Sequence, residues 1–265
     1  MIKALITDLD GTILFNDAFP EVVREGINTL IKNGVKVYIA SGRMLSSIYH
    51  YHRMLGLDTP IIAYNGAMIG DKDLNIIYHN PIEYSLWYQI FNMLLEEDLQ
   101  INLYFNDSLY IFRKNGYGGN YPIQNKVPAF FVDKIEDLPE LPTTKVLGIG
   151  DPDIVRKVQV QLKERYNSNL YITTSSPTYL EIMNRDVSKG RALSILSSIT
   201  GISVSEMAGL GDSFNDLELI MDSGLGITFD NAPLELKENA DYVTGLSSPE
   251  GFREVVDFIL WKNLY

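Results

Sequence analysis

The motif DLDGT at residues 8–12 constrains the fold most, because it places Asp8 and Asp10 directly after a mainly apolar run at residues 2–6. Such a run predicts a buried strand, and Gly11 predicts a turn at its end. Side chains alternate along a strand, so residues two apart start from the same side. Two carboxylates this close repel each other unless a cation or a shared proton is present. The motif therefore predicts either a charged site at a strand end or an ordinary Asp-Gly turn.

The composition limits the classes of partner. The chain has 265 residues, a net charge of −12 from 22 basic and 34 acidic residues, and no cysteine. Nucleic acids and anionic membranes require a basic surface, so neither is expected as a partner. The absence of cysteine excludes disulfides and thiolate catalysis, and we expect a cytoplasmic protein. The longest strongly apolar stretch, residues 84–95, is much shorter than the roughly 20 residues of a membrane span.

A second strand is expected to bring another polar side chain to the same edge as Asp8. Residues 21–33 carry apolar side chains at helical spacing, and residues 35–40 form an apolar run that ends in Ser41, Gly42 and Arg43. A strand, a helix and a strand form a right-handed parallel unit, which places Ser41 beside Asp8. Alternatively, Ser41 caps a helix at residues 44–55, and both roles are compatible.

Polar residues that fit the same edge return late in the chain. Ser188 is a good N-cap for a helix that begins near Lys189. A lysine at the positive end of a helix is electrostatically unfavourable, and an anion bound there would relieve the conflict; the alternative is an ordinary solvated lysine. A fourth strand, residues 207–211, ends directly before Asp212, Asn215 and Asp216.

The middle of the chain has a different character. Residues 60–64 are expected to form the third strand of the core, and two short strands follow as a hairpin. From residue 82 the pattern changes to an aromatic helix, short strands, an exposed loop at residues 115–125 and further helix and sheet. We therefore expect two domains: a catalytic core of residues 1–81 and 185–265, and an inserted domain of residues 82–184.

The predicted edge unites carboxylates, a hydroxyl and a lysine. Ligands bind at the carboxyl ends of the strands in an open parallel sheet. Carboxylate oxygens suit Mg²⁺, and a bound dication would then attract a dianion such as phosphate. This arrangement allows one carboxylate to act as a nucleophile while the other groups hold the phosphoryl oxygens.

The sequence resembles the haloacid dehalogenase superfamily of phosphohydrolases and, within it, the Cof-type sugar-phosphate phosphatases. Four motifs match in order: DLDGT, ASGR at residues 40–43, VSKG at residues 187–190 and GDSFND at residues 211–216. YNGA at residues 64–67 and SSPTYLEI at residues 175–182 extend the match over essentially the whole chain. The resemblance implies an α/β fold: a Rossmann-like parallel sheet core with an inserted α+β cap domain that selects small phosphorylated metabolites.

The resemblance also implies roles for individual residues. Asp8 would be the nucleophile that forms an aspartyl-phosphate, and Asp10 would protonate the leaving group and then activate water. Mg²⁺ would be bound by the Asp8 carboxylate, the Asp10 carbonyl and Asp212, and Asp216 would complete the metal site by steadying the water shell. The expected substrate-binding set is Ser41, Gly42, Arg43, Asn65, Lys189 and Asn215. We expect a monomer or a weak homodimer.

Three positions depart from the family pattern. Ser41 replaces the commoner threonine but keeps the hydroxyl. Asp230 stands where relatives usually have glycine, and it either alters substrate preference or caps the next helix. Ser213 and Phe214 occupy a variable pair, for which we expect no role.

Other functions remain open from the sequence alone. A phosphomutase shares the motifs but usually has a smaller cap. A dehalogenase has no use for Asp10 or a metal. A phospho-acceptor of the receiver type is about half as long, and a silent binding protein would not need the complete set of chemical residues.

Overall fold

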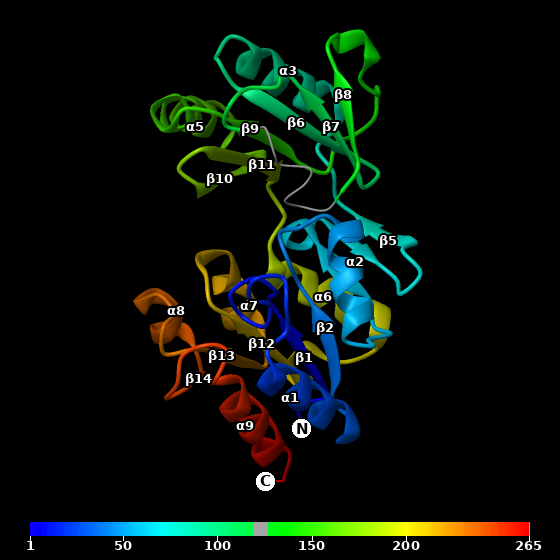
Figure 1. Cartoon of the computed structure of the whole chain (residues 1–265), viewed down its shortest axis with the longest axis vertical. Coiled ribbons are helices and arrows are strands. Elements are labelled where there is room, and N and C mark those ends of the chain that lie inside the picture. Colours follow the sequence, from blue (N-terminus) through cyan, green and yellow to red (C-terminus); the bar gives the residue numbers. More distant parts are fainter. Residues whose placement is uncertain (119–126, 265) are drawn as a thin grey trace. The chain divides into compact units, whose positions relative to one another are not determined.

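The computed structural model describes residues 1–118 and 127–264, so most of the predicted loop at residues 115–125 lies outside them. The chain divides into two compact units (Figure 1). The first unit comprises Met1–Ile77 and Ser188–Tyr265, and the second comprises Tyr78–Val187. The second unit is thus an insertion between two segments of the first.

A five-stranded parallel sheet forms the centre of the first unit. Its order is β14-β13-β12-β1-β2. The strands are β1 (Ala4–Thr7), β2 (Lys36–Ile39), β12 (Met207–Gly211), β13 (Leu225–Thr228) and β14 (Tyr242–Val243). Thr7 pairs with Ile39 on one side and with Leu210 on the other. In this register the carboxyl ends of β1, β2 and β12 meet at one edge of the sheet.

Strands β1, β12 and β13 are buried along their whole lengths, as expected for a parallel sheet with both faces covered. The helices of this unit are α1 (Glu21–Lys32), α2 (Leu45–Met54), α6 (Lys189–Thr200), α7 (Leu217–Asp222), α8 (Leu234–Asn239) and α9 (Phe252–Leu264). Helices α1 and α9 pack closely at Gly26, where a Cβ atom would lie 2.7 Å from the Phe252 ring. Gly26 thus permits the close packing of these two helices.

The predicted third strand of the core does not extend the main sheet as expected. Strand β3 (Ile61–Ala63) pairs antiparallel with β4 (Met68–Gly70), and these form a separate three-stranded sheet with β5 (Ile76–His79). Its link to the main sheet is an isolated parallel bridge between Ala40 and Ile62. Strand β3 therefore pairs with β4 at all three of its residues but with the main sheet only through Ile62.

The second unit contains a six-stranded, mainly antiparallel sheet in the order β10-β11-β9-β6-β7-β8. Its strands are β6 (Gln100–Phe105), β7 (Ser108–Phe112), β8 (Ala129–Val132), β9 (Val146–Ile149), β10 (Leu170–Ser176) and β11 (Tyr179–Asn184). Strand β8 was not predicted, and it pairs parallel with β7. Helices α3 (Tyr84–Leu95) and α5 (Pro152–Tyr166) complete the unit.

Both helices of the second unit pack on the same face of its sheet. Trp87 and Phe91 of α3, and Val158 of α5, share a core with Ile101 and Leu103 of β6. The predicted fold class, a parallel Rossmann-like sheet with an additional α+β unit, is confirmed (Figure 1). Among the described residues, no helix combines the length and the apolar character needed to cross a bilayer.

Candidate active site

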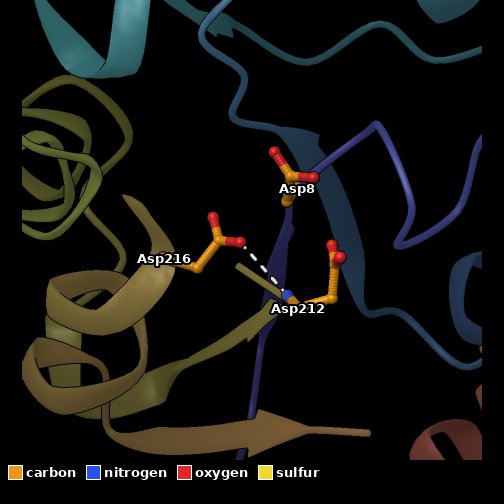
Figure 2. A group of neighbouring side chains, drawn as sticks. All are labelled: Asp8, Asp212 and Asp216. Carbon is orange, nitrogen blue, oxygen red and sulfur yellow. Dashed lines mark hydrogen bonds between the residues drawn. The ribbon is translucent and has the colours of Figure 1, made fainter. Parts of the chain in front are cut away.

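Carboxylates from two strands meet at the carboxyl edge of the five-stranded sheet (Figure 2). Asp8 follows β1 and Asp212 follows β12, and the pairing of these strands places the two residues side by side. Asp216 ends the short 3-10 helix η4 (Phe214–Asp216), which directly precedes α7. One carboxylate oxygen from each of the three residues lies within 4.8 Å of the others.

Lys189 is completely buried at the first position of α6, so the alternative of a solvated lysine is wrong. Its Nζ donates to Asp8 Oδ1 and to Asp216 Oδ1, each at 2.5 Å. Ser188 caps the helix as predicted, and its hydroxyl accepts from the Arg191 N–H. The unfavourable position of a cation at this helix end is therefore offset by two carboxylates.

Asp216 is held by three donors. One oxygen accepts from Lys189, and the other accepts from the backbone N–H groups of Asp212 (3.1 Å) and Ser213 (3.0 Å). The dashed line in Figure 2 marks the first of these backbone contacts. Asp216 thereby fixes the loop that carries Asp212.

Burial shifts the protonation equilibria of the cluster. Desolvation raises the pKa of Asp8 to about 7; Lys189 opposes this shift, and the charges of Asp216 and Asp212 add to it. Burial likewise raises the pKa of Asp212, against hydrogen bonds from Thr12 and Ser213. Burial alone would lower the pKa of Lys189, but the two carboxylates outweigh it and raise that pKa. Lys189 therefore stays charged.

The donor set fits a hard divalent cation. Three carboxylates against one ammonium leave two negative charges uncompensated when all the groups are ionised. Oxygen-only donors of this kind suit Mg²⁺ better than softer metals. Asp216 accepts three hydrogen bonds, two of them from fixed backbone N–H groups. The side-chain hydroxyls at Asp212 can rotate away, so Asp8 and Asp212 are the better placed direct ligands.

The Asp10 side chain does not join this cluster. It is 49% exposed, and its two oxygens accept from Arg43, from Nη2 at 2.6 Å and from Nε at 2.7 Å. The Arg43 Nη1 also reaches the Tyr51 hydroxyl at 3.5 Å. Burial lowers the pKa of Arg43, but the bond to Asp10 and its charge outweigh burial and raise it.

The remaining residues of the expected substrate-binding set lie close together. The Ser41 hydroxyl accepts from the Arg43 N–H, and the Asn65 N–H donates to the Ser41 carbonyl. The Asn215 amide donates to Asn65 Oδ1 at 3.2 Å. A Cβ atom at Gly42 would lie 3.1 Å from the same oxygen. Ser41 does not cap α2, because that helix begins after Met44 without a side-chain cap.

Two residues with close contacts to the cluster were given no role from the sequence. Thr12 is fully buried, and its hydroxyl donates to Asp212 Oδ1 and lies 3.3 Å from Asp8 Oδ2. Ser213, for which no role was expected, donates from its hydroxyl to Asp212 Oδ2 at 3.1 Å. Thr12 lies in the DLDGT motif and Ser213 in the GDSFND motif, so a hydroxyl next to the motif carboxylates is the sequence signal that could have identified both residues.

Asp230 does not cap the following helix. Helix α8 begins after Pro233, which makes no side-chain cap. Asp230 is exposed, and its carbonyl accepts from Lys237 Nζ at 3.0 Å. The capping alternative is therefore wrong, and an effect on substrate preference stays a prediction.

Comparison with known proteins places this geometry in a family context. A model of the haloacid dehalogenase-like hydrolases matches residues 5–256. The chain is 29% identical over 259 residues to a 5-amino-6-(5-phospho-D-ribitylamino)uracil phosphatase of Bacillus subtilis, with 96% of this chain and 94% of the relative covered.

Solved structures agree with the fold. A haloacid dehalogenase-like hydrolase from Bacteroides thetaiotaomicron is 25% identical with a TM-score of 0.88, covering 98% of this chain and 100% of the other. The protein TM0651 from Thermotoga maritima is 30% identical with a TM-score of 0.86, and 98% of each chain is covered.

Proposed function

The chain belongs to the haloacid dehalogenase-like hydrolase family and is a phosphatase, and we propose that it hydrolyses small phosphorylated metabolites, sugar phosphates above all, through an aspartyl-phosphate on Asp8. The observation that carries the proposal is the buried group of Asp8, Asp212, Asp216 and Lys189 at one sheet edge. The relative from Bacillus subtilis, named for a phosphorylated ribityl compound, supports the substrate class.

Asp8 is the proposed nucleophile. A carboxylate oxygen attacks phosphorus, the bond to the leaving oxygen breaks, and water then cleaves the aspartyl-phosphate to release phosphate. Lys189 holds the Asp8 carboxylate by a bond to Oδ1 and places a positive charge where phosphoryl oxygens would gather. Ser41 and Asn215, with the Gly42 N–H, are the proposed further donors to those oxygens.

Asp10 is the proposed general acid and base. It would protonate the leaving oxygen in the first step and accept a proton from water in the second. Arg43 engages both of its oxygens, so this exchange requires one Arg43 bond to loosen. We therefore assign Arg43 to the orientation of Asp10 as well as to the substrate-binding set.

Mg²⁺ is the proposed cofactor, held by Asp8 and Asp212 with the Asp10 carbonyl, while Asp216 fixes the Asp212 loop. The ion would supply neutralisation of the phosphoryl charge. Thr12 and Ser213 orient the Asp212 oxygens by hydrogen bonds. Such supporting bonds tune metal sites in general.

The inserted unit is the proposed substrate-specificity domain. The sequence placed it at residues 82–184, and we keep the proposal that it acts as a cap for the leaving group. A cap of this size favours small metabolites over phosphoproteins as substrates. A cytoplasmic monomer or weak homodimer remains our proposal.

The test is the steady release of phosphate from p-nitrophenyl phosphate and from a panel of phosphorylated metabolites, with and without Mg²⁺. We expect turnover only with Mg²⁺, and loss by many powers of ten in Asp8→Asn, as for other covalent nucleophiles. Transfer of phosphate between positions of one sugar without net release would instead indicate a mutase. More than a few per cent of activity in Asp8→Asn would refute the nucleophile assignment.

A further inference from the structure

The loop after β1 contacts the segment after β2 at a second point besides Asp10. Phe15 and Ala18 exchange two backbone hydrogen bonds of 2.9 Å, and Asn16 and Asp17 between them have φ of +49° and +62°. Two residues with positive φ between such paired positions are typical of a two-residue hairpin turn of the I′ type. The backbone of this turn therefore holds Asp17 in a defined place.

Tyr51 of α2 is the side chain that Asp17 contacts from this turn. The Tyr51 hydroxyl donates to Asp17 Oδ1 at 2.5 Å. Tyr51 is only 1% exposed, and the Phe19 ring packs edge-on against the Tyr51 ring with 6.1 Å between the ring centroids. A phenol has one proton to donate, and here Asp17 receives it. Toward any further polar group, the Tyr51 oxygen can therefore only accept.

Arg43 is placed to use both the oxygen and the ring of Tyr51. Its Nη1 lies 3.5 Å from the Tyr51 hydroxyl, and its Cζ lies 5.2 Å from the centroid of the Tyr51 ring. A guanidinium at this distance is attracted by the π electrons of the ring. The bond to the Asp17 carboxylate also polarises the hydroxyl, which makes its oxygen a stronger acceptor for Arg43.

The nitrogen atoms of Arg43 are thus divided between two partners. Nε and Nη2 donate to Asp10, whereas Nη1 faces Tyr51. Exchange of a proton at Asp10 requires one of its bonds to Arg43 to loosen. An arginine side chain has several rotatable bonds, so a guanidinium attached to Asp10 alone would gain freedom at that moment. The contact with Tyr51 uses other atoms of the guanidinium and persists while Asp10 exchanges its proton.

We propose that Tyr51 is a positioning residue for the general acid and base: it keeps the Arg43 guanidinium beside Asp10, and Asp17 fixes Tyr51 for this task. All four residues belong to the first unit. The proposal rests on the proposed phosphatase function for its role in turnover. The attachment of Arg43 to Tyr51 does not depend on that function.

The first test is the dependence of three variants on the leaving group. Tyr51→Phe loses the hydroxyl and keeps the ring, Tyr51→Leu loses both, and Asp17→Asn weakens the acceptor while asparagine still suits the positive φ. We compare kcat on the sugar phosphate that the natural protein turns over fastest with single-turnover release of nitrophenol from p-nitrophenyl phosphate, whose leaving group needs no proton.

We expect a graded loss on the sugar phosphate alone. Its kcat should fall about threefold to tenfold in Tyr51→Phe and in Asp17→Asn, which lose or weaken one hydrogen bond. In Tyr51→Leu it should fall about tenfold to a hundredfold, because the cation–π contact is lost as well. The single-turnover release of nitrophenol should stay within about twofold of the natural rate in all three variants, because this step requires no proton from Asp10.

Two controls separate positioning from a general loss of structure. Tyr38→Phe removes the hydroxyl of another tyrosine that is 1% exposed, and its partner Thr200 ends α6 at the opposite end from Lys189. We expect Tyr38→Phe to leave both rates unchanged. In the Arg43→Ala background, Tyr51→Leu should cause no further loss on the sugar phosphate, because its effect passes through Arg43. Equal slowing of both reactions by Tyr51→Leu, or losses that add fully to those of Arg43→Ala, would overturn the proposal.

The attachment of Arg43 is measured separately from turnover. Exchange of the Arg43 Nε–H proton with solvent is followed by NMR in the isotope-labelled protein, without substrate or Mg²⁺. We expect Tyr51→Leu to accelerate this exchange about fivefold or more, and Tyr38→Phe to leave it unchanged. If the natural protein hydrolyses no phosphate ester but Tyr51→Leu accelerates the exchange, the proposed function fails and the attachment of Arg43 to Tyr51 stands. An unchanged exchange rate in Tyr51→Leu would overturn the inference whatever the activity.

Discussion

The Arg43 guanidinium donates two hydrogen bonds to the Asp10 carboxylate, from Nη2 to Oδ1 at 2.6 Å and from Nε to Oδ2 at 2.7 Å. The pair joins the loop after β1 to the loop after β2. A bidentate pair of this kind fixes the carboxylate plane as well as its position. Asp10, the proposed general acid and base, is therefore oriented by Arg43, which lies in the same loop as Ser41 of the proposed substrate-binding set.

The first prediction concerns this pair. Asp10→Asn should slow a sugar phosphate far more than the first step with p-nitrophenyl phosphate, because p-nitrophenolate leaves without a proton. With the aryl ester it should give a burst near one nitrophenol per site, then slow turnover. Arg43→Lys keeps the positive charge but cannot donate two parallel hydrogen bonds to the Asp10 carboxylate. We expect Arg43→Lys to show the same dependence on the leaving group as Asp10→Asn. Its loss of kcat on the sugar phosphate should be smaller, about tenfold to a hundredfold, because the general acid–base group itself is still present.

Stopped-flow release of nitrophenol and steady-state kcat on the sugar phosphate measure these effects. Lys189→Ala serves as the contrast, because it weakens phosphoryl binding and should slow both substrates alike. If Asp10→Asn and Arg43→Lys also slow both substrates equally, without a burst in Asp10→Asn, the acid–base assignment is wrong.

The sequence was sufficient to predict which residues of the candidate site lie at one sheet edge, but not their contacts with one another. Asp8 and Asp212 follow apolar runs, and parallel strands bring such positions to one edge. The burial of Lys189 was not predicted, because a single lysine gives no sign of which carboxylates surround it. The same limit applies to Arg43, whose partner Asp10 is 33 residues away in the chain.

Short strands were the weakest part of the fold prediction. Residues 60–64 are apolar like the other core strands, but the pattern does not say which neighbour such a strand pairs with. Strand β8 is four residues long and carries Phe130 and Phe131 exposed, so it lacks the alternation of a half-buried strand.

The second prediction concerns the ion pairs of Lys189. Lys189→Met leaves Asp8 and Asp216 without their counter-charge in a buried place, which typically costs about 3–5 kcal/mol. Urea denaturation without Mg²⁺ should show this loss, and added Mg²⁺ should restore part of it, because the ion binds only the folded site. Lys72→Met removes a surface ion pair to Asp73 and should change the stability little. Equal stabilities of the two variants would contradict the prediction.

The third prediction is a pH dependence of the metal-free protein. Burial raises the pKa of Asp8 from 3.8 to about 7. In the unfolded chain Asp8 therefore loses its proton near pH 4, whereas in the folded chain it keeps the proton up to about pH 7. The contribution of Asp8 to the free energy of unfolding consequently falls as the pH rises from about 4 to 7. Above pH 7 the loss is complete and the dependence ends.

His52 acts in the opposite direction. Its pKa is lowered by burial, so it removes stability as the pH falls below about 6.5. The difference in Tm between the natural protein and Asp8→Asn cancels that contribution. We expect the Tm of the natural protein to fall relative to that of Asp8→Asn as the pH rises from 4 to 7. Saturating Mg²⁺ should abolish this trend. A difference independent of pH without Mg²⁺ would show that Asp8 titrates normally.

The fourth prediction uses two glycines with the same backbone conformation. Gly11 has φ of +82° and Gly34 has φ of +80°, so alanine at either position is strained by about 1–2 kcal/mol. At Gly34 a Cβ atom meets nothing within 4 Å, whereas at Gly11 it would lie 2.8 Å from Asp212 Oδ2. Gly11→Ala should therefore displace Asp212 and raise the Mg²⁺ concentration for half-maximal activity, about tenfold or more as for other disturbed supports of metal ligands. Gly34→Ala should lower Tm alone. If the two variants need the same Mg²⁺ concentration, the Asp212 carboxylate is not held against Gly11 in the working enzyme.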